Sequence, residues 1–201
     1  DNGVRVWDAR NWKLIHSLEC HTGGVRAVSF TRNGKWLLSG SRDKSIRVWN
    51  VKTGAPINNI TIHKGAISAI LALPGGKLVY SASSDKRDNS EIAVWDLESG
   101  RKVKNIKGHR SPVTAFALSL DGKYVASGSK DRTIRLWDAK THKLHKTLGV
   151  LDGHKKSIRS IAFLTGNKRI ISGSDDNSIL IWDVESENIV KSLTGHRRRI
   201  S

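Results

Sequence analysis

The sequence predicts an all-β fold built from tandem units, each containing four short strands. The first observation is a regular spacing between histidine and tryptophan. It measures 28 residues for His21–Trp49, His109–Trp137 and His154–Trp182, and 32 for His63–Trp95. The return from a Trp to the next His is 14 residues, except for 17 between Trp137 and His154. Self-similarity at a period of 42 to 46 residues is typical of a repeat architecture.

The second observation is that the units align almost letter for letter. Leu38–Trp49 reads LSGSRDKSIRVW, Ala126–Trp137 reads ASGSKDRTIRLW, and Ile171–Trp182 reads ISGSDDNSILIW. Gly-His pairs precede these segments and Trp-Asp pairs close most of them, with departures at Cys20-His21, Ile62-His63 and Trp49-Asn50. The units therefore resemble the WD repeats of a β-propeller, and the resemblance covers essentially the whole chain.

The first unit shows how each blade is expected to form. Its β-prone runs are separated by Gly, Asn, Asp and Pro, and they lie at Val25–Phe30, Trp36–Ser41, Ser45–Trp49 and Ala55–Ile60. In the layout that the resemblance implies, the outermost strand of a blade comes from the preceding sequence unit. We therefore expect one array over residues 1–201, with complete blades at about 10–50, 53–96, 100–138 and 142–183. Partial blades are expected at 1–8 and 186–201.

Such propellers usually close with seven blades, so four blades predict an open arc. Asp1 precedes Trp7 by six residues, as Asp43 precedes Trp49, and the sequence contains no Met. These features indicate a fragment of a longer coding sequence.

Composition adds a strong basic excess. The chain has 35 Lys and Arg against 18 Asp and Glu, a formal net charge of +17. Acidic or phosphate-bearing partners are therefore expected. No apolar run reaches the length of a membrane span and no secretory segment opens the sequence, so we expect a cytoplasmic or nuclear protein. Cys20 is the only cysteine, which excludes an internal disulfide and a thiolate metal site.

Each unit carries a Ser, a His and an Asp that together imitate a catalytic triad. The four sets, with their Trp, are His21, Ser39, Asp43, Trp49; His63, Ser81, Asp85, Trp95; His109, Ser127, Asp131, Trp137; and His154, Ser172, Asp176, Trp182. A hydrolase needs one activated nucleophile beside an oxyanion hole, whereas this set recurs in every unit. The resemblance implies a buried structural tetrad instead. We expect no catalytic residue, metal site or cofactor, because the histidines occur one per unit without a ligand partner.

We therefore expect the function to be binding at the surface of the protein. In the family, ligands often contact the residue before the tetrad Asp and the residues three and five positions after the His, on the face called the top. This rule selects several positions in each unit, Asp175 among them. From these positions the expected partner-binding residues are Arg26, Arg42, Ser68, Thr114, Lys130, Arg159 and Arg199. We expect a non-catalytic scaffold that binds an acidic or phosphorylated peptide, anchored by Arg26, Arg42, Lys130 and Arg159. The alternative is a solvated basic rim without a dedicated ligand.

Two further functions use other features. The basic surface also permits a ribonucleoprotein or chromatin role, although Trp12 and Trp36 are expected in strands and offer no exposed stacking platform. Trp7-Asp8-Ala9-Arg10 matches the WDxR pattern that some propellers present to the adaptor of a cullin-type ubiquitin ligase, so the third possible function is a substrate receptor of such a ligase. Two lengthened loops, Ser83–Ser90 and Leu148–Asp152, could be contact loops or tolerated insertions.

Overall fold

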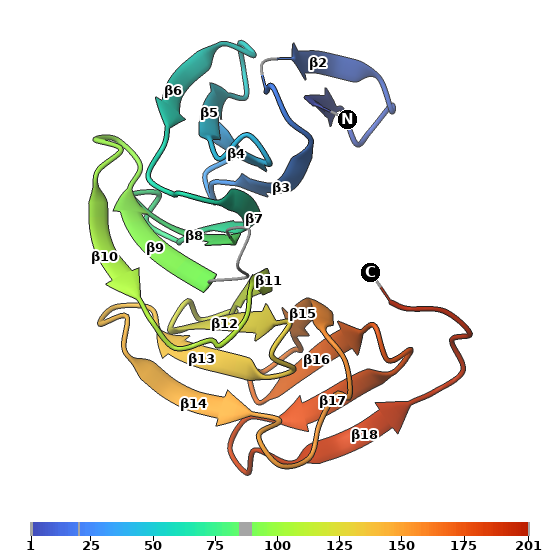
Figure 1. Cartoon of the computed structure of the whole chain (residues 1–201). Coiled ribbons are helices and arrows are strands. Elements are labelled where there is room, and N and C mark those ends of the chain that lie inside the picture. The colour runs from blue at the N-terminus through green and yellow to red at the C-terminus, as the bar shows by residue number, and fades with distance from the viewer. Residues whose placement is uncertain (1, 20, 85–89, 201) are drawn as a thin grey trace. The chain divides into compact units, whose positions relative to one another are not determined.

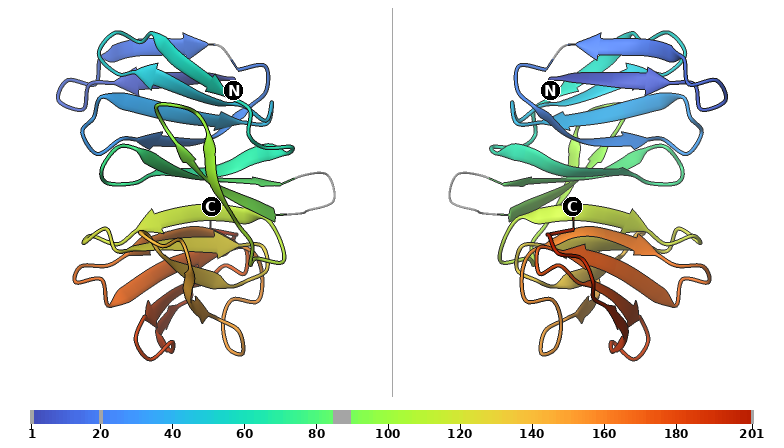
Figure 2. Two further views of the ribbon diagram at one scale, coloured as in Figure 1. Left: turned by 90° about the vertical axis from the view of Figure 1, so that its left-hand side faces the viewer. Right: turned by 90° about the vertical axis from the view of Figure 1, so that its right-hand side faces the viewer.

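The structure is a computed structural model that describes residues 2–19, 21–84 and 90–200. Throughout these ranges the regular elements are all strands, β1 to β18, as the sequence predicts. The described part of the chain contains no helix that is long and apolar enough to span a membrane. The fold divides into two compact units, Asp1–Lys86 with Ala93–Asn105, and Arg87–Ile92 with Ile106–Ser201. Figures 1 and 2 show the twisted antiparallel sheets of each unit.

The first unit carries a two-stranded sheet and two four-stranded sheets. The small sheet pairs β1 (Gly3–Trp7) with β2 (Leu14–Glu19). The next sheet has the order β3 (Val25–Phe30), β4 (Trp36–Ser41), β5 (Ile46–Asn50), β6 (Pro56–Ile60). The last has the order β7 (Ala66–Ala72), β8 (Leu78–Ser84), β9 (Ser90–Asp96), β10 (Lys102–Ile106).

The second unit carries two four-stranded sheets with the same consecutive order. One contains β11 (Val113–Leu118), β12 (Tyr124–Ser129), β13 (Ile134–Asp138) and β14 (Leu144–Leu148). The other contains β15 (Ile158–Phe163), β16 (Arg169–Ser174), β17 (Ile179–Asp183) and β18 (Ile189–Leu193). Short turns join successive strands, so every pairing is antiparallel.

The expected blade bounds are wrong by one strand. The ranges 10–50, 53–96, 100–138 and 142–183 each join the last strand of one sheet to the first three of the next. The structure instead pairs β6 with β5, and β14 with β13, so the sheets span 25–60, 66–106, 113–148 and 158–193. The physical reason is the short turn after each Trp-containing strand, which folds the following strand back as a hairpin.

The same pairing changes both expected partial blades. The N-terminal sheet is larger than residues 1–8, because β2 pairs with β1 along Gly3–Trp7. At the other end, β18 is the outer strand of the β15–β18 sheet rather than part of a further blade. The tip of the expected insertion at Ser83–Ser90 lies outside the described residues.

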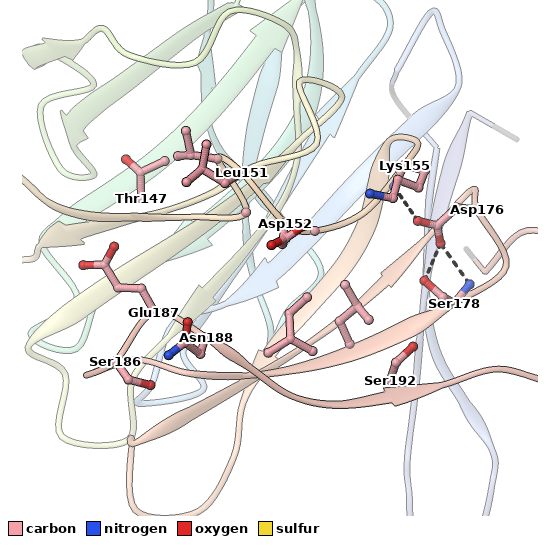
Figure 3. Close-up of a pocket in the computed structure, with 15 residues that line it drawn as sticks. Thr147, Leu151, Asp152, Lys155, Asp176, Ser178, Ser186, Glu187, Asn188 and Ser192 are labelled. Carbon is pink, nitrogen blue, oxygen red and sulfur yellow. Dashed lines mark hydrogen bonds between the residues drawn. The ribbon is translucent and has the colours of Figure 1, made fainter.

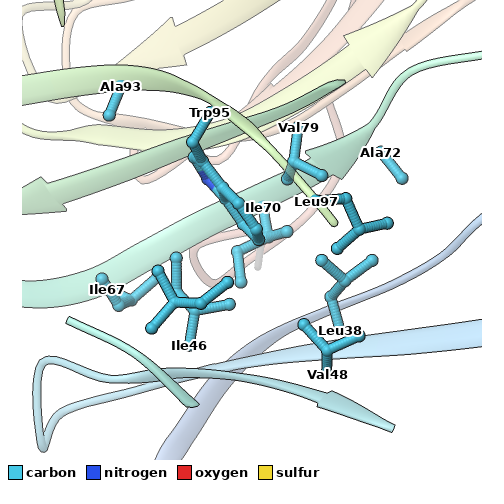
Figure 4. Packing of buried hydrophobic residues seen from close by; sticks show 11 residues of the cluster. Leu38, Ile46, Val48, Ile67, Ile70, Ala72, Val79, Ala93, Trp95 and Leu97 are labelled. Atoms are coloured by element: carbon cyan, nitrogen blue, oxygen red, sulfur yellow. The ribbon is translucent and has the colours of Figure 1, made fainter. Parts of the chain in front are cut away.

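Apolar side chains fill the space between neighbouring sheets within each unit. In the first unit, Ile46 and Val48 of one sheet pack with Ile67 and Trp95 of the next (Figure 4). In the second unit, Leu136 and Leu148 similarly pack with Ile158 and Trp182. The tryptophan in the third strand of each four-stranded sheet is almost completely buried, namely Trp49, Trp95, Trp137 and Trp182. Burial between neighbouring sheets therefore stabilises each unit.

A glycine in the second strand permits this close stacking. A Cβ built on Gly128 of β12 would lie 2.8 Å from Cγ2 of Ile158, and one on Gly173 of β16 would lie 2.7 Å from Cγ2 of Ile200. Ile158 and Ile200 each follow a unit histidine by four residues. The backbone N–H of Ile200 also donates to the carbonyl of Ser174 at 3.1 Å. Ile200 thus covers β16 as Ile158 covers β12.

Candidate functional site

The best-defined polar arrangement is the expected tetrad, seen clearly in the β11–β14 sheet. The Trp137 indole N–H donates to Ser127 Oγ at 2.8 Å, and Ser127 Oγ lies 2.7 Å from His109 Nε2. On the other side of the ring, His109 Nδ1 lies 2.8 Å from Asp131 Oδ2. The loop before β11 supplies the His, and the turn between β12 and β13 supplies the Asp. The four groups therefore tie loop to turn.

The same chain of hydrogen bonds recurs in two other sheets. His21 bridges Ser39 at 2.8 Å and Asp43 at 2.9 Å, while Trp49 donates to Ser39 at 2.9 Å. The β15–β18 sheet repeats the arrangement with His154, Ser172, Asp176 and Trp182, at 2.7 to 3.0 Å.

The β7–β10 sheet contains the described part of the fourth tetrad. Ser81 Oγ lies 2.7 Å from His63 Nε2 and accepts the Trp95 indole N–H at 3.0 Å. His63 Nδ1 lies 2.9 Å from Ser83 Oγ. The fourth expected member, Asp85, lies outside the described residues.

The geometry accounts for the chemistry of the tetrad. An indole N–H only donates and an ionised carboxylate only accepts. With a neutral imidazole, Nδ1–H therefore donates to Asp131 and Nε2 accepts the Ser127 hydroxyl hydrogen. The Ser127 oxygen accepts the indole N–H of Trp137 through a lone pair, and Ser127 has no exposed surface. A nucleophile must reach its substrate, so these buried serines serve as internal connectors in the scaffold.

The tetrad carboxylates are held in the ionised form. For Asp131, burial opposes ionisation, but the hydrogen bonds from His109 and Thr133 outweigh it and keep the pKa well below its usual range. For Asp43, burial is likewise outweighed by hydrogen bonds from Ser45 and His21, which lower the pKa. Asp176 shows the same direction, because hydrogen bonds outweigh its burial and lower its pKa.

A further hydroxyl belongs to each of these networks and was missed by the sequence reasoning. Ser45, Thr133 and Ser178 each donate a hydroxyl to the tetrad Asp at 2.6 Å, and their backbone N–H groups donate to the same oxygen. The residue between Asp and hydroxyl has a positive φ, 72° at Arg132. The sequence feature that indicates this hydroxyl is a Ser or Thr two positions after the tetrad Asp in these three units.

The aspartate of each Trp-Asp pair has a structural role separate from that of the tetrad. Asp138 Oδ1 accepts the backbone N–H groups of Lys140 and Thr141 at 3.0 and 2.6 Å. The bond from the Thr141 backbone is the main cause that lowers the pKa of Asp138. This carboxylate closes the turn between the third and fourth strands.

Three of the expected partner-binding residues use their polar groups in hydrogen bonds to other parts of the fold. Arg159 donates to Asp175 through Nε at 2.9 Å and Nη2 at 2.6 Å. Thr114 donates to the carbonyls of Ile158 and Gly128, at 2.6 and 3.0 Å. Ser68 similarly donates to a backbone carbonyl at 3.3 Å. Their sequence positions therefore serve packing within a unit.

The other four expected partner-binding residues lie on the surface. Arg26 and Arg42 are exposed in the first unit, and Lys130 and Arg199 are exposed in the second. Arg199 lies near Asp175, where its charge contributes, after the Arg159 hydrogen bond, to lowering the pKa of the Asp175 carboxyl. Exposed cations thus remain in both units.

One tryptophan corrects the expectation of no exposed stacking platform. Trp12 is 77% exposed, and it lies in a turn with a φ of 58° rather than in a strand. Trp36, by contrast, lies in β4 as expected.

Residues 2–19, 21–84 and 90–200 contain no group of three or more His, Cys, Asp or Glu that could hold a metal ion. The hydrogen bonds of the tetrads join the loop before the first strand to the turn between the second and third strands.

Comparison with known proteins agrees with this geometry. A family model described as WD domain, G-beta repeat (WD40) matches residues 12–50, 100–138 and 145–183, together more than half of the chain. "Retinoblastoma-binding-like protein E" of Dictyostelium discoideum is 45% identical over 42 residues, 21% of this chain. "Elongator complex protein 2" of the same organism is 46% identical over 41 residues, 20% of this chain. These matches span only 8% and 5% of the two relatives. With its tetrads and repeats in place, the chain belongs to the WD40 repeat family.

Proposed function

We propose that the chain is a non-catalytic scaffold that binds an acidic or phosphorylated segment of a partner protein. WD repeats support a protein-interaction role, and the buried tetrads leave the surface as the place for recognition. The names of the two relatives describe a protein-binding protein and a subunit of a complex. Assembly into a multiprotein complex is accordingly the role proposed for this chain.

The exposed cations carry the proposal for the chemistry of the partner. Arg42 and Arg199 are exposed beside elements that the tetrads hold in place. A guanidinium can hydrogen-bond a carboxylate or a phosphate through two parallel donors. The basic charge of +17 also favours encounter with an acidic segment.

The test measures anisotropy of a short labelled peptide that alternates glutamate and phosphoserine. We expect Arg42→Glu combined with Arg199→Glu to weaken binding by about tenfold or more, since each reversal replaces a charge-assisted contact with repulsion. Lys52→Glu combined with Lys140→Glu is the charge-matched control, because these exposed lysines lie in the turns after Trp49 and Trp137. Equal weakening by both pairs would show that net charge alone attracts the peptide.

Nucleic acid is the second candidate, and the exposed ring of Trp12 favours it. Its neighbours Arg10 and Lys13 are exposed cations that could contact phosphates beside a stacked base. A partner with about six phosphate contacts should lose about three decades of affinity between 50 and 200 mM salt. If a single-stranded oligonucleotide binds more tightly than the acidic peptide and shows this slope, the protein-segment proposal is wrong.

The adaptor-binding function rests on Arg10 alone. Its backbone N–H donates to Asp8 at 2.7 Å and the residue is exposed. Loss of adaptor co-purification on Arg10→Ala would support this function, and failure of the unmodified chain to bind the adaptor would remove it.

A further inference from the structure

The lengthened loop after β14 has a well-packed base and an apolar tip. His154 follows Leu148, the last residue of β14, by six residues, whereas His109 follows Ile106 of β10 by three. At the tip, Val150 is 67% exposed and Leu151 is 94% exposed. Both side chains are therefore accessible to a partner.

Two glycines hold the base of this loop against the β15–β18 sheet. A Cβ on Gly149, which has a φ of 81°, would lie 3.2 Å from Cη2 of Trp182 and 3.3 Å from the carbonyl oxygen of Arg132. A Cβ on Gly153 would lie 2.9 Å from the Cα of Gly149. This close packing explains why the base needs glycine, but it makes no use of Val150 and Leu151. The loop therefore has a fixed base that presents two apolar side chains.

The loop separates two hollows of different chemistry. One, of about 980 Å³, is lined by polar and apolar residues including Asp152, Asp176 and Glu187. Figure 3 shows this hollow, with Leu151 near Thr147 and the Lys155 backbone bonded to Asp176. The other, of about 310 Å³, is lined by the same loop and by basic residues. We call the second hollow the basic pocket.

Four cationic side chains and a single carboxylate line the basic pocket. They are Arg110, Arg132, Arg135, Lys155 and Asp131. The carboxylate is already occupied, because Asp131 accepts hydrogen bonds from His109, Thr133 and the backbone of Arg110. It therefore provides little compensation for the cations, and an anion entering the pocket gains their attraction.

Arg135, which lines the pocket, carries an unsatisfied buried donor. Its Nε is buried and has no hydrogen-bond acceptor in the described part of the chain. A Cβ on Gly108 would lie 2.6 Å from Nη1 of Arg135, so this glycine leaves room for the guanidinium beside Trp137. A buried donor without an acceptor is costly and calls for an explanation. Arg47 holds the same place in β5 with the same unpaired Nε, but its following loop lacks the three extra residues.

We infer that the basic pocket binds the phosphate of a phosphorylated protein segment, and that Val150 and Leu151 cover an apolar side chain next to it. Three guanidinium groups and an ammonium suit a dianionic phosphate better than a single carboxylate. The apolar tip accounts for a partner that contributes a hydrocarbon side chain, which a free phosphate or a nucleic-acid backbone lacks. The inference depends on the proposed function only for the class of occupant, and it uses none of the cations Arg26, Arg42, Lys130 or Arg199.

The test titrates the ¹⁵N-labelled chain with an end-capped phosphoserine-leucine dipeptide and follows the amide signals of Gly149 and Gly153. We expect saturable shifts, and about tenfold weaker binding of the unphosphorylated dipeptide. Arg132→Gln should weaken the phosphorylated probe about tenfold, because it removes a charged donor from an exposed side chain. Leu151→Ser should weaken the dipeptide by about threefold to tenfold while leaving inorganic phosphate unchanged.

Arg135 is tested by the conservative change Arg135→Lys, which keeps the charge but removes the planar fork. We expect weaker binding of the dipeptide, whereas Arg47→Lys in β5 should leave it unchanged. Equal shifts with the two dipeptides, or no effect of Arg132→Gln, would overturn the inference. A single-stranded oligonucleotide that shifts the same amides at lower concentration would also overturn it.

The outcome is separable from that of the proposed function. If the Arg42 and Arg199 reversals leave acidic-peptide binding intact while Gly149 and Gly153 still respond, the surface proposal fails and the basic pocket stands. If the peptide depends on Arg42 and Arg199 but the two glycines do not respond to the dipeptide, the pocket inference alone fails.

Discussion

Arg159 and Asp175 form a bidentate ion pair, with Arg159 Nη2 2.6 Å from Asp175 Oδ2 and Nε within 3.0 Å of both carboxylate oxygens. Family-based positions would assign both residues to ligand contact. In the structure, the Arg159 guanidinium and the Asp175 carboxylate pair with each other instead. The hydrogen bond from Arg159 is the main cause that lowers the pKa of Asp175. The pair therefore restricts which cations on this surface are available to an acidic partner.

Removing the carboxylate should release Arg159. We expect Asp175→Ser to strengthen binding of the glutamate-phosphoserine peptide severalfold, because a guanidinium loses its internal partner. Glu98→Ser is the control, since it removes one negative charge from an exposed residue in the turn after β9, outside the loop after β14. Anisotropy titrations compare the two variants. The same gain from both changes would mean that overall charge, rather than release of Arg159, produces the effect.

Breaking a tetrad should lower stability. His109→Ala leaves Asp131 and Ser127 without their shared partner, and a buried group left unsatisfied costs about 1 to 3 kcal/mol. His196→Ala is a matched control, because His196 also follows a glycine but is exposed. Urea unfolding of the two variants measures the difference. Unchanged stability of His109→Ala would show that the tetrad contributes little to the fold.

The lowered pKa values of Asp43, Asp131 and Asp176 predict acid sensitivity. A carboxylate whose pKa is lower in the folded state stabilises the fold above its unfolded pKa, near 3.9 for Asp. This stability is lost as the pH falls below about 4 towards the folded pKa values. The urea midpoint should therefore fall steeply in this range. Asp131→Asn should make the fall shallower, whereas Asp152→Asn should follow the unmodified chain.

Repetition and geometry explain what could be predicted. The tetrads are predictable because the same residue types recur at one spacing, and each must satisfy buried polar groups. The pairing of β6 with β5 was misassigned because periodicity marks the repeat but not the sheet to which its last strand belongs. The Arg159–Asp175 pair depends on the orientation of two neighbouring side chains, which spacing does not determine. The pocket around Arg135 likewise needs the loop after β14 to be placed in space.

Trp12 should be replaceable with a gain in stability. Its φ of 58° is unfavourable for a residue with a Cβ, and Gly54 adopts a φ of 72° at the equivalent turn. Trp12→Gly should stabilise the chain by up to about 1 kcal/mol, because relief of the left-handed conformation outweighs the added backbone entropy of the unfolded state. Trp12→Ala removes the ring but keeps the Cβ, so it should give no gain. Thermal unfolding checks both variants, and destabilisation by Trp12→Gly would show that the exposed ring packs favourably.

Gly128 tests the packing of neighbouring sheets in the second unit. A Cβ at this position would approach Cγ2 of Ile158 at 2.8 Å and Cγ2 of Ile161 at 3.0 Å, so one of these side chains must move. We expect Gly128→Ala to destabilise the chain by about 1 to 3 kcal/mol, the usual cost of overpacking. Ile158→Ala removes Cγ2 together with the rest of the side chain beyond Cβ and should by itself cost about 2 to 5 kcal/mol. In the double variant the smaller side chain at position 158 leaves room for the new Cβ. The measured loss of unfolding free energy should therefore be smaller than the sum of the losses of the two single variants. Urea unfolding of the single and double variants provides this cycle. Strict additivity would show that the Gly128 backbone, rather than contact with Ile158, requires glycine.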